Sequence, residues 1–379
     1  MEKPEIYLDN AATTRVCTEA ADIAYKVMTD CYGNPSSTHT KGRDAKAYLD
    51  TARAQIASAL GCSASEVYFT SCGSESDVWA ITRGAESAAR RARHIISSTV
   101  EHDAVRKTLE ELESRGFEVT YLSPEKDGSV SADAVKAALR EDTILVTLMM
   151  VNNETGGITD IAAIAKMLKG CGSKALLHTD AVQGFMKVPF SAKKLGADMI
   201  SISGHKIHAP KGIGALYIKT GVKIKPLIRG GAQEGGMRAG TEAMPQIAAF
   251  GKAAEIAFSG MKDNCDTMAS LRALAMSTIC ADIPEAQIIG GGAPHILSVS
   301  LPGWRSEVLM NFLEAEGIYV SRSSACKKGG RSHVLEAMRL PAQVIDGAIR
   351  VSFSRYNTED DVLALCSALK RAHDTLAHR

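Results

Sequence analysis

The feature that most constrains the fold of this chain is an alternation of short, β-branched apolar runs with longer stretches at helical spacing. Helical patterns separate most of these runs; one of them, residues 42–61, carries apolar residues on one face and ends at Gly61. Such alternation indicates an α/β fold whose central sheet is mostly parallel and covered by helices on both faces. The strand-like runs are "EVYFTS" (66–71), "HIISST" (94–99), "EVTYLS" (118–123), "TILVTLMMVN" (143–152), "ALLHTDA" (175–181) and "DMISIS" (198–203).

The pattern changes after about residue 250, where the strands become fewer and lie among helices. A helical run at 244–260 is followed by the strand pattern "HILSVSLPG" (295–303) and the helical pattern "SEVLMNFLEAEG" (306–317). The strands "IYVS" (318–321) and "GAIRVSFS" (347–354) and a C-terminal helix complete the chain. We predict a large α/β domain over residues 15–250 and a smaller α+β domain built from residues 1–14 and 251–379.

Length and charge narrow the class of protein further. A chain of 379 residues suits two domains, and 45% hydrophobic with 23% charged residues is ordinary for a globular protein. The net charge of +1 provides no global field for nucleic acid or for an anionic membrane. The N-terminal stretch lacks the apolar centre of a signal peptide, and no run is long enough to span a membrane. We therefore expect a cytoplasmic protein that contacts neither membrane nor nucleic acid directly.

The cysteines do not form a framework. There are nine, at irregular spacing and without a CxxC pair, so neither disulfides nor a metal site is predicted. Most, such as Cys366 in a helical apolar stripe, fit the pattern of small buried hydrophobes. Cys326 differs, because it stands among small residues in "SRSSACKKGGRSH" (321–333), next to Lys327 and Lys328. Neighbouring ammonium groups favour a thiolate, although a solvated loop explains the lysines equally well.

Two ionisable residues stand at the ends of apolar strand patterns, where a charge is costly unless it has a partner. Lys206 follows the run at 198–203, and burial would lower its pKa and expose the lone pair that forms an imine. In isolation, a solvated loop lysine is the competing interpretation. Asp180 ends the run at 175–181, and a pyridoxal phosphate enzyme needs such a carboxylate to keep the cofactor's ring nitrogen protonated.

Two further motifs suit an aromatic phosphate ester. In "TSCGSES" (70–76) a strand runs into a helix through small residues, so Gly73 and Ser74 can hold a phosphate at the helix N-terminus. The motif is neither a Walker A loop nor a GxGxxG fingerprint. His102 follows another strand, where its imidazole can stack on an aromatic ring; taken alone, it fits a structural role better.

In combination and order, these motifs resemble the class V aminotransferase group of pyridoxal phosphate enzymes, specifically the NifS/IscS-like cysteine desulfurases. The resemblance is collinear over nearly the whole chain. The matching segments are "YLDNAATT" (7–14), "YGNPSSTHTKGRDA" (32–45), "FTSCGSESD" (69–77), "TVEHDAV" (99–105), "VNNETG" (151–156), "HTDAVQ" (178–183), "SGHKIHAPKGIGALY" (203–217), "GGAQEGGMRAGT" (230–241), "SRSSAC" (321–326) and "IRVS" (349–352).

The resemblance implies the aspartate-aminotransferase-like fold (fold type I) and roles for individual residues around pyridoxal 5'-phosphate. Lys206 binds the cofactor covalently and moves protons, Asp180 pairs with the ring nitrogen, and His102 stacks on the ring and assists proton transfer. The phenolic-oxygen side of the ring is bonded by Gln183 and Asn153. The phosphate is held by Gly73, Ser74, Ser203 and His205, with Thr241 reaching in from the other subunit of a homodimer.

The resemblance also implies the reaction. Arg350, with Asn34, binds the α-carboxylate of L-cysteine, because an arginine fork suits that planar anion. Cys326 takes the sulfur as a persulfide, L-alanine leaves, and the sulfur passes to an acceptor protein for iron–sulfur clusters, thiocofactors or tRNA thiolation. Two alternatives remain open: a selenocysteine lyase or another class V aminotransferase, and a non-catalytic scaffold that partners sulfur-carrying proteins.

Two departures from the family pattern concern the flanks of the site. Only "KKGGR" separates Cys326 from "SHVL", a linker about two residues shorter than usual, which has less reach but loses less entropy on ordering. We therefore hypothesise an acceptor other than the usual iron–sulfur scaffold protein. Gly235 occupies a position where an arginine is usual.

Overall fold

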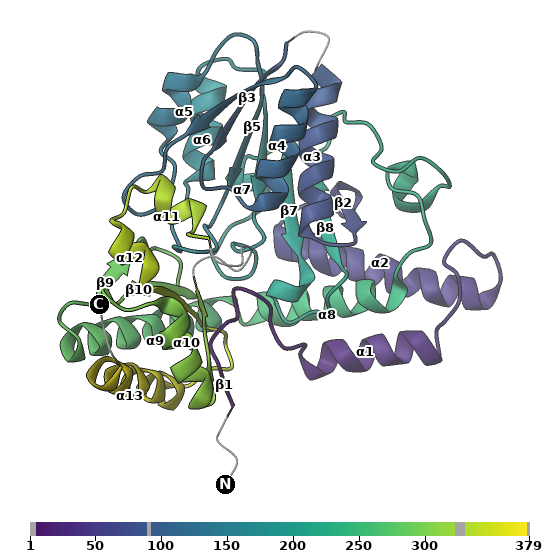
Figure 1. The fold of residues 1–379 in the computed structure, drawn as a ribbon. Helices are drawn as coiled ribbons and strands as arrows, with labels where there is room; N and C mark the ends of the chain where they lie inside the picture. The colour runs from purple at the N-terminus through teal and green to yellow at the C-terminus, as the bar shows by residue number, and fades with distance from the viewer. Residues whose placement is uncertain (1–4, 89–91, 323–329, 377–379) are drawn as a thin grey trace.

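The computed structural model describes residues 5–88, 92–322 and 330–376. Within these ranges the larger part is built on a seven-stranded sheet with the strand order β2-β8-β7-β6-β5-β3-β4 (Figure 1). All neighbouring strands are parallel except β8, which runs antiparallel to both β2 and β7. The predicted α/β fold with a mostly parallel sheet is confirmed. The strands are β2 (Val67–Thr70), β3 (His94–Ser98), β4 (Glu118–Leu122), β5 (Thr143–Met149), β6 (Leu176–Asp180), β7 (Met199–Ser203) and β8 (Gly214–Ile218).

Helices cover both faces of this sheet, and each face has its own apolar cluster. On one face Trp79 of α3 and Leu109 of α4 pack against strand residues such as Ile95. On the other face Ile56 of α2 and Ile247 of α8 belong to the larger cluster. The helices are α1 (Thr18–Thr29), α2 (Thr40–Leu60), α3 (Gly73–Ala88), α4 (Asp103–Ser114), α5 (Ala132–Ala138), α6 (Ile161–Gly170), α7 (Ala192–Leu195) and α8 (Met244–Ser259), with 3-10 turns η1 (Ala64–Glu66), η2 (Gly204–Lys206) and η3 (Gln233–Gly236).

The C-terminal part contains a smaller antiparallel sheet in the order β12-β13-β10-β9. Helices α9, α10 and α13 pack together with it around a separate apolar cluster (Figure 1). The strands are β9 (Gln287–Ile289), β10 (Ile296–Ser300), β12 (Ser321–Arg322) and β13 (Ala348–Ser352), and the helices are α9 (Met261–Asp282), α10 (Ser306–Ala315), α11 (His333–Ala337), α12 (Ala342–Asp346) and α13 (Glu359–Thr375).

The N-terminal segment connects the two parts. Strand β1 (Ile6–Tyr7) pairs in parallel with β11 (Ile318–Tyr319), and Ile6 and Leu8 are buried in the cluster of the C-terminal part. A few residues later Thr14 donates its backbone N–H to His205 O, beside the end of β7. The chain between these contacts therefore crosses from one part to the other. The domain limits at residues 15 and 250 remain a prediction.

One predicted strand differs from the structure, and one helix was not predicted. The run "IYVS" is not one strand, because Ile318–Tyr319 pair with β1 whereas Ser321–Arg322 pair with β13. Helix α9 was not predicted, since its buried residues form a narrow stripe among polar ones. These are Cys265, Met268, Leu271, Ala275 and Ile279.

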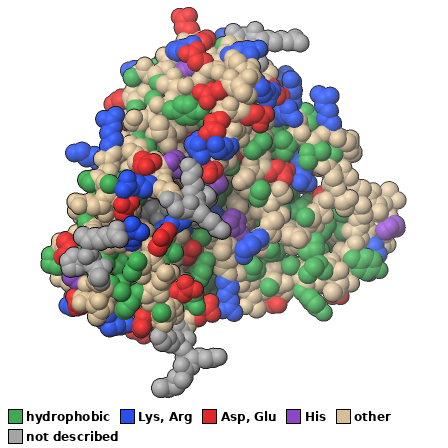
Figure 2. All heavy atoms as spheres, in the orientation of Figure 1, with side chains coloured by type: hydrophobic (Ala, Val, Ile, Leu, Met, Phe, Trp, Pro, Cys, Tyr) green, Lys and Arg blue, Asp and Glu red, His purple; other side chains and the backbone are tan. Residues whose placement is uncertain are grey.

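No helix in the described ranges is both long and apolar enough to cross a membrane. Figure 2 shows acidic and basic side chains interspersed over one face of the molecule. On this face the charges do not divide into large fields of one sign.

Candidate active site

A cavity of about 290 Å³ lies beyond the carboxyl ends of β5, β6 and β7. This is where open parallel sheets bind ligands, because the loops that follow neighbouring strands converge there. The structure brings together in its wall most of the residues predicted for the site. These are Gly73, Ser74, His102, Asn153, Asp180, Gln183, Ser203, His205, Lys206 and Arg350.

Two predicted residues that the structure describes do not line the cavity. Asn34 and Thr241 are both exposed, and Asn34 Oδ1 accepts from the backbone N–H of Ser36 at 2.9 Å. A single chain therefore does not place Asn34 or Thr241 at the site, and Thr241 was expected to act from the other subunit. Cys326 lies outside the described residues.

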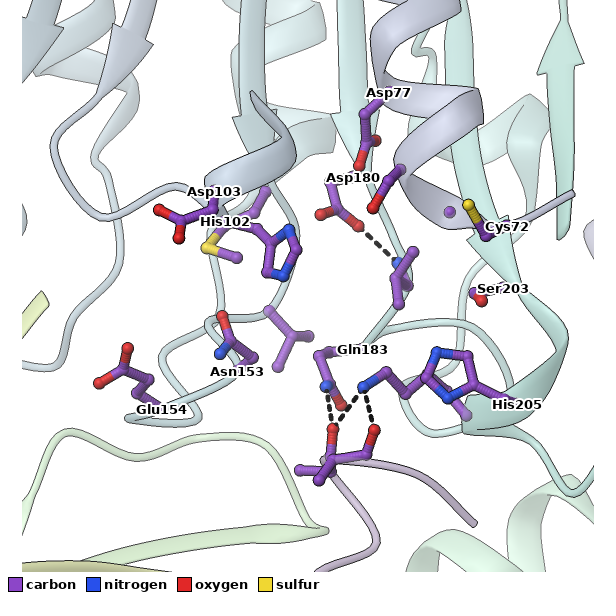
Figure 3. Close-up of a pocket in the computed structure, with 18 of the residues that line it drawn as sticks. Cys72, Asp77, His102, Asp103, Asn153, Glu154, Asp180, Gln183, Ser203 and His205 are labelled. Carbon is purple, nitrogen blue, oxygen red and sulfur yellow. Dashed lines mark hydrogen bonds between the residues drawn. The ribbon is translucent and has the colours of Figure 1, made fainter. Parts of the chain in front are cut away.

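Lys206 lies in the short turn η2 directly after β7, and the N-terminal segment holds its side chain. The Nζ atom donates to the carbonyl oxygens of Ala11 at 2.6 Å and Ala12 at 2.8 Å (Figure 3). Gln183 Nε2 donates to the same Ala11 oxygen at 2.9 Å. The nearby Lys206 adds to the effect of burial on His205, whose pKa falls to about 4. The amine is thus fixed at the cavity wall beside a neutral imidazole.

Asp180 ends β6 with only 6% of its surface exposed. Its Oδ1 accepts from the backbone N–H of Val182 at 2.8 Å, which fixes the carboxyl toward the cavity (Figure 3). Burial raises the pKa of Asp180, while His102 and Lys206 act in the opposite direction. A cationic ring nitrogen beside Asp180 would act in the same direction as His102 and Lys206 and lower this pKa, as an opposite charge does for any buried carboxylate.

His102 is the N-cap residue of α4, and its ring stands beside Asp180 in the cavity (Figure 3). Its Nδ1 accepts from the backbone N–H of Ala104 at 3.2 Å. In the neutral imidazole the proton therefore belongs on Nε2. The cap fixes the orientation of the ring, and His102 lines the cavity in that orientation.

The opposite end of the cavity suits a phosphate. Gly73 begins the sixteen-residue helix α3, whose first N–H groups and dipole attract an anion. A Cβ at Gly73 would lie 2.7 Å from Val182 Cγ2, so only glycine allows this close packing. Ser203 is 2% exposed, and its Oγ has no hydrogen-bond partner within the described residues. A buried hydroxyl without a partner at a helix N-terminus fits a phosphate oxygen, and the residues present therefore fit pyridoxal phosphate.

Arg350 extends from β13 of the C-terminal part to the cavity and is 3% exposed. Its Nη2 pairs with Asp9 Oδ1 at 2.9 Å, and its Nη1 donates to Asn153 O at 2.8 Å. The Nε atom has no acceptor in the part of the chain that the structure describes. The guanidinium is thus held in place, and the Nε–H is among the donors left for a ligand carboxylate.

Several residues of the site were missed by the sequence analysis. Asp9 and the carbonyls of Ala11 and Ala12 lie in "YLDNAATT", but their partners are distant in sequence, so spacing gave no signal for the contacts. Glu154 lines the cavity, and burial raises its pKa to about 7. Asp77 is also in the cavity wall and 1% exposed. A charged residue on an apolar helix face was the signal that could have identified Asp77.

The Gly235 position has a structural explanation. Its backbone has φ of +63°, which glycine adopts without strain, and nothing lies within 4 Å of the place of a Cβ. The departure from arginine therefore leaves an open, unstrained turn.

Comparisons with known proteins agree with this geometry. The profile of the family described as Aminotransferase class-V matches residues 6–365. A protein named cysteine desulfurase IscS from Methanosarcina thermophila is 42% identical over 366 residues, covering 95% of this chain and 90% of that protein.

Solved structures show the same relationship. A structure titled as a NifS-like protein superposes with a TM-score of 0.93 at 38% identity, covering 98% of this chain and all of the other. A structure of SspA in complex with cysteine gives a TM-score of 0.79 at 32% identity, with 94% of this chain and 100% of that one covered. The chain belongs to the class V aminotransferase family, among the NifS/IscS-like cysteine desulfurases.

Proposed function

We propose that this protein uses the cavity to convert L-cysteine to L-alanine and transfers the sulfur to Cys326. The observation that carries the proposal is the convergence of Lys206, Asp180 and Arg350 on one cavity from three distant parts of the chain. This trio supplies an amine, a buried carboxylate and a guanidinium. In pyridoxal phosphate enzymes a lysine carries the cofactor and a charged side chain faces its ring nitrogen, and an arginine suits the carboxylate of an amino-acid substrate.

Each residue has a defined task in the cavity. Lys206 Nζ is the amine that would hold the cofactor and carry the proton taken from the substrate Cα. Asp180 is the carboxylate that would keep the cofactor's ring nitrogen protonated. Bound pyridoxal phosphate supplies the electron sink for the charge that develops on the substrate Cα. Ser203 Oγ and the first N–H groups of α3 receive the phosphate.

Substrate binding and sulfur transfer follow from the remaining groups. The Nε–H of Arg350 binds the substrate α-carboxylate. The Cys326 thiolate attacks the substrate sulfur, an S–S bond forms as the C–S bond breaks, and the electron pair of that bond stays with the three-carbon product. Cys326 ends as a persulfide, and protonation of the product gives alanine. The thiolate form is favoured by the adjacent Lys327 and Lys328.

Beyond this reaction, we propose a cytoplasmic homodimer in which Thr241 of each subunit contributes to the phosphate site of the other. The persulfide sulfur passes to an acceptor protein, for iron–sulfur clusters or for thiolation of cofactors or tRNA. The short linker after Cys326 favours an acceptor other than a generic iron–sulfur scaffold protein. Equally fast transfer to such a scaffold as to every other acceptor would contradict this choice.

Two substitutions test the function. Lys206→Ala should abolish the absorbance of the covalently bound cofactor together with alanine formation. Cys326→Ala should retain that absorbance but lose alanine formation from L-cysteine by several orders of magnitude. A transaminase would not need the thiol, and a non-catalytic scaffold would produce no alanine in any variant. Normal alanine and persulfide production by Cys326→Ala would overturn the proposed mechanism.

A further inference from the structure

Two carboxyl groups from different elements lie together at the inner end of the cavity. Asp77 projects from α3 and Asp180 ends β6, and Figure 3 shows them next to each other. Asp77 is 1% exposed and Asp180 is 6% exposed. The proposed function gives Asp180 a role at the cofactor ring but leaves Asp77 without one.

The groups that face Asp77 offer it no cation within the described residues. On β6, His178 Nε2 lies 3.6 Å from Asp77 Oδ1, but burial lowers the pKa of His178 to about 3, so this ring is neutral. His178 is also engaged, since its ring nitrogens contact Thr147 Oγ1 at 2.8 Å and Ser201 Oγ at 2.9 Å. Asp180 on β6, Glu101 before α4 and Cys72 before α3 raise the pKa of Asp77 through their charges, whereas a hydrogen bond from Ser201 on β7 acts in the opposite direction.

The hydrogen bonding of Asp77 is also incomplete. Its Oδ1 has no hydrogen-bond partner among the residues that the structure describes. A buried carboxylate in that state would be strongly disfavoured, whereas a protonated carboxyl needs fewer donors around it.

Asp180 stands in a different electrostatic position from Asp77. His102 and Lys206 both act on Asp180 and oppose the effect of its burial on the pKa. Burial and the adjacent Asp180 together raise the pKa of Asp77 well above its usual range. Two carboxylates in one buried space cannot both ionise without a large cost in free energy. The proton that the pair retains therefore belongs on Asp77.

We propose that Asp77 is a positioning residue for the reaction: as a neutral carboxyl beside Asp180, it keeps the negative charge of the pair on Asp180, toward the cofactor ring. Asp77 thereby sets how firmly the ring nitrogen holds its proton. The inference rests on the proposed function, because it requires pyridoxal phosphate in this cavity.

Two substitutions separate a neutral hydrogen-bonding group from a charge and from simple packing. Asp77→Asn reproduces the shape and polarity of a protonated carboxyl but cannot ionise. Asp77→Leu keeps comparable bulk and removes the polar group. Both variants are prepared without cofactor and titrated with pyridoxal phosphate. The readouts are the dissociation constant and the pH at which the absorption band of the bound cofactor shifts.

The proposal predicts that Asp77→Asn binds pyridoxal phosphate within about threefold of the wild type and shifts its absorption band at the same pH. Asp77→Leu should bind at least about tenfold more weakly and shift the band at a different pH. A purely structural role of Asp77 would leave unchanged the pH at which the absorption band of the bound cofactor shifts. If Asp77→Leu does not fold, Asp77→Ala, which also removes the polar group, takes its place in the comparison.

Two results would overturn the inference. If Asp77→Asn changes the pH at which the absorption band shifts, Asp77 is ionised in the wild type and is not the neutral group that the inference requires. If Asp77→Leu matches the wild type in both readouts, Asp77 does not act through Asp180. Failure of the wild-type protein itself to bind pyridoxal phosphate would instead refute the proposed function, and the inference with it.

Discussion

Glu101 is a buried carboxyl whose protonation should make the stability of the protein depend on pH. It is 1% exposed, its Oε1 accepts from Ser98 Oγ at 2.5 Å, and burial raises its pKa to about 8. Because the folded-state pKa lies above the unfolded value, the stabilisation is complete below pH ~4.3 and is lost as the pH rises through about 8.

Glu101→Gln should remove this dependence, since the amide does not titrate. Relative to the wild type, the variant should gain unfolding free energy between about pH 5 and pH 8, by an amount on the order of 1–4 kcal/mol. Urea unfolding of both proteins without cofactor at several pH values measures the difference. A difference that is the same at every pH would contradict the assignment of a raised pKa to Glu101.

Ser203 should contribute directly to binding of the cofactor phosphate. Its buried Oγ is unbonded within the described chain, and a hydrogen bond to a charged group contributes about 1.5–3 kcal/mol. Ser203→Ala should therefore weaken pyridoxal phosphate binding by roughly 10- to 100-fold. Ser97→Ala is the matched control, because Ser97 is also buried with an unbonded Oγ in the described chain but does not line the cavity. Equal effects of the two substitutions would contradict the phosphate role.

The sequence was informative about residues that stand at the ends of apolar strands. Lys206 and Asp180 are expensive to bury there without a function, and the structure places both in the cavity wall. The pairing of Arg350 with Asp9 was not predictable in this way, because the partners lie 341 positions apart and neither position shows the pairing locally. Local patterns indicate a candidate, whereas the fold alone supplies its partner.

Among the elements, the segment that contains η3 is held to the large sheet by a buried ion pair. Arg53 of α2 donates from Nη1 and Nη2 to the carboxylate of Glu234, at 2.7 Å each, and the N–H of Phe69 in β2 donates to Glu234 Oε2 at 2.8 Å. Thr241 lies a few residues beyond η3. The pair thus anchors the segment from which the other subunit is proposed to receive Thr241.

Glu234→Ala should destabilise the protein by about 1–3 kcal/mol, because the partly buried Arg53 and the buried N–H of Phe69 both lose their acceptor. The control is Glu255→Ala, which breaks an exposed pair with Lys252 and should cost less than about 1 kcal/mol. Thermal or urea unfolding of the two variants provides the comparison. Similar losses in both would show that Glu234 does not anchor its segment.

Element types were more predictable than element limits and partners. The strand at 143–152 was predicted too long, since β5 stops at Met149. The polar residues that follow Val151 instead turn back, with Asn152 Oδ1 accepting from the N–H groups of Glu154 and Thr155. By contrast, the end of α2 at Gly61 was correct because its cause is local: the backbone there has φ of +66°, which glycine adopts freely.

At the scale of the whole molecule, the proposed homodimer has sites that combine Lys206 of one subunit with Thr241 of the other, and mixed dimers can test this. Mixing Lys206→Ala and Thr241→Ala subunits creates dimers in which one site has Lys206 from one chain and Thr241 from its partner. If the subunits mix at random, about a quarter of all sites regain both residues. Alanine formation should therefore rise above the sum of the two parents. Activity equal to that sum would show that Thr241 does not act across the dimer.

The central claim is that Cys326 receives the sulfur of L-cysteine, and mass spectrometry of the digested protein tests it most directly. After incubation with L-cysteine and trapping of thiols, the peptide that contains Cys326 should gain one sulfur atom. The other eight of the nine cysteines should gain none, and Lys206→Ala should show no gain at any position. A sulfur gain on a different cysteine, or an unmodified Cys326 peptide while alanine accumulates, would contradict the account.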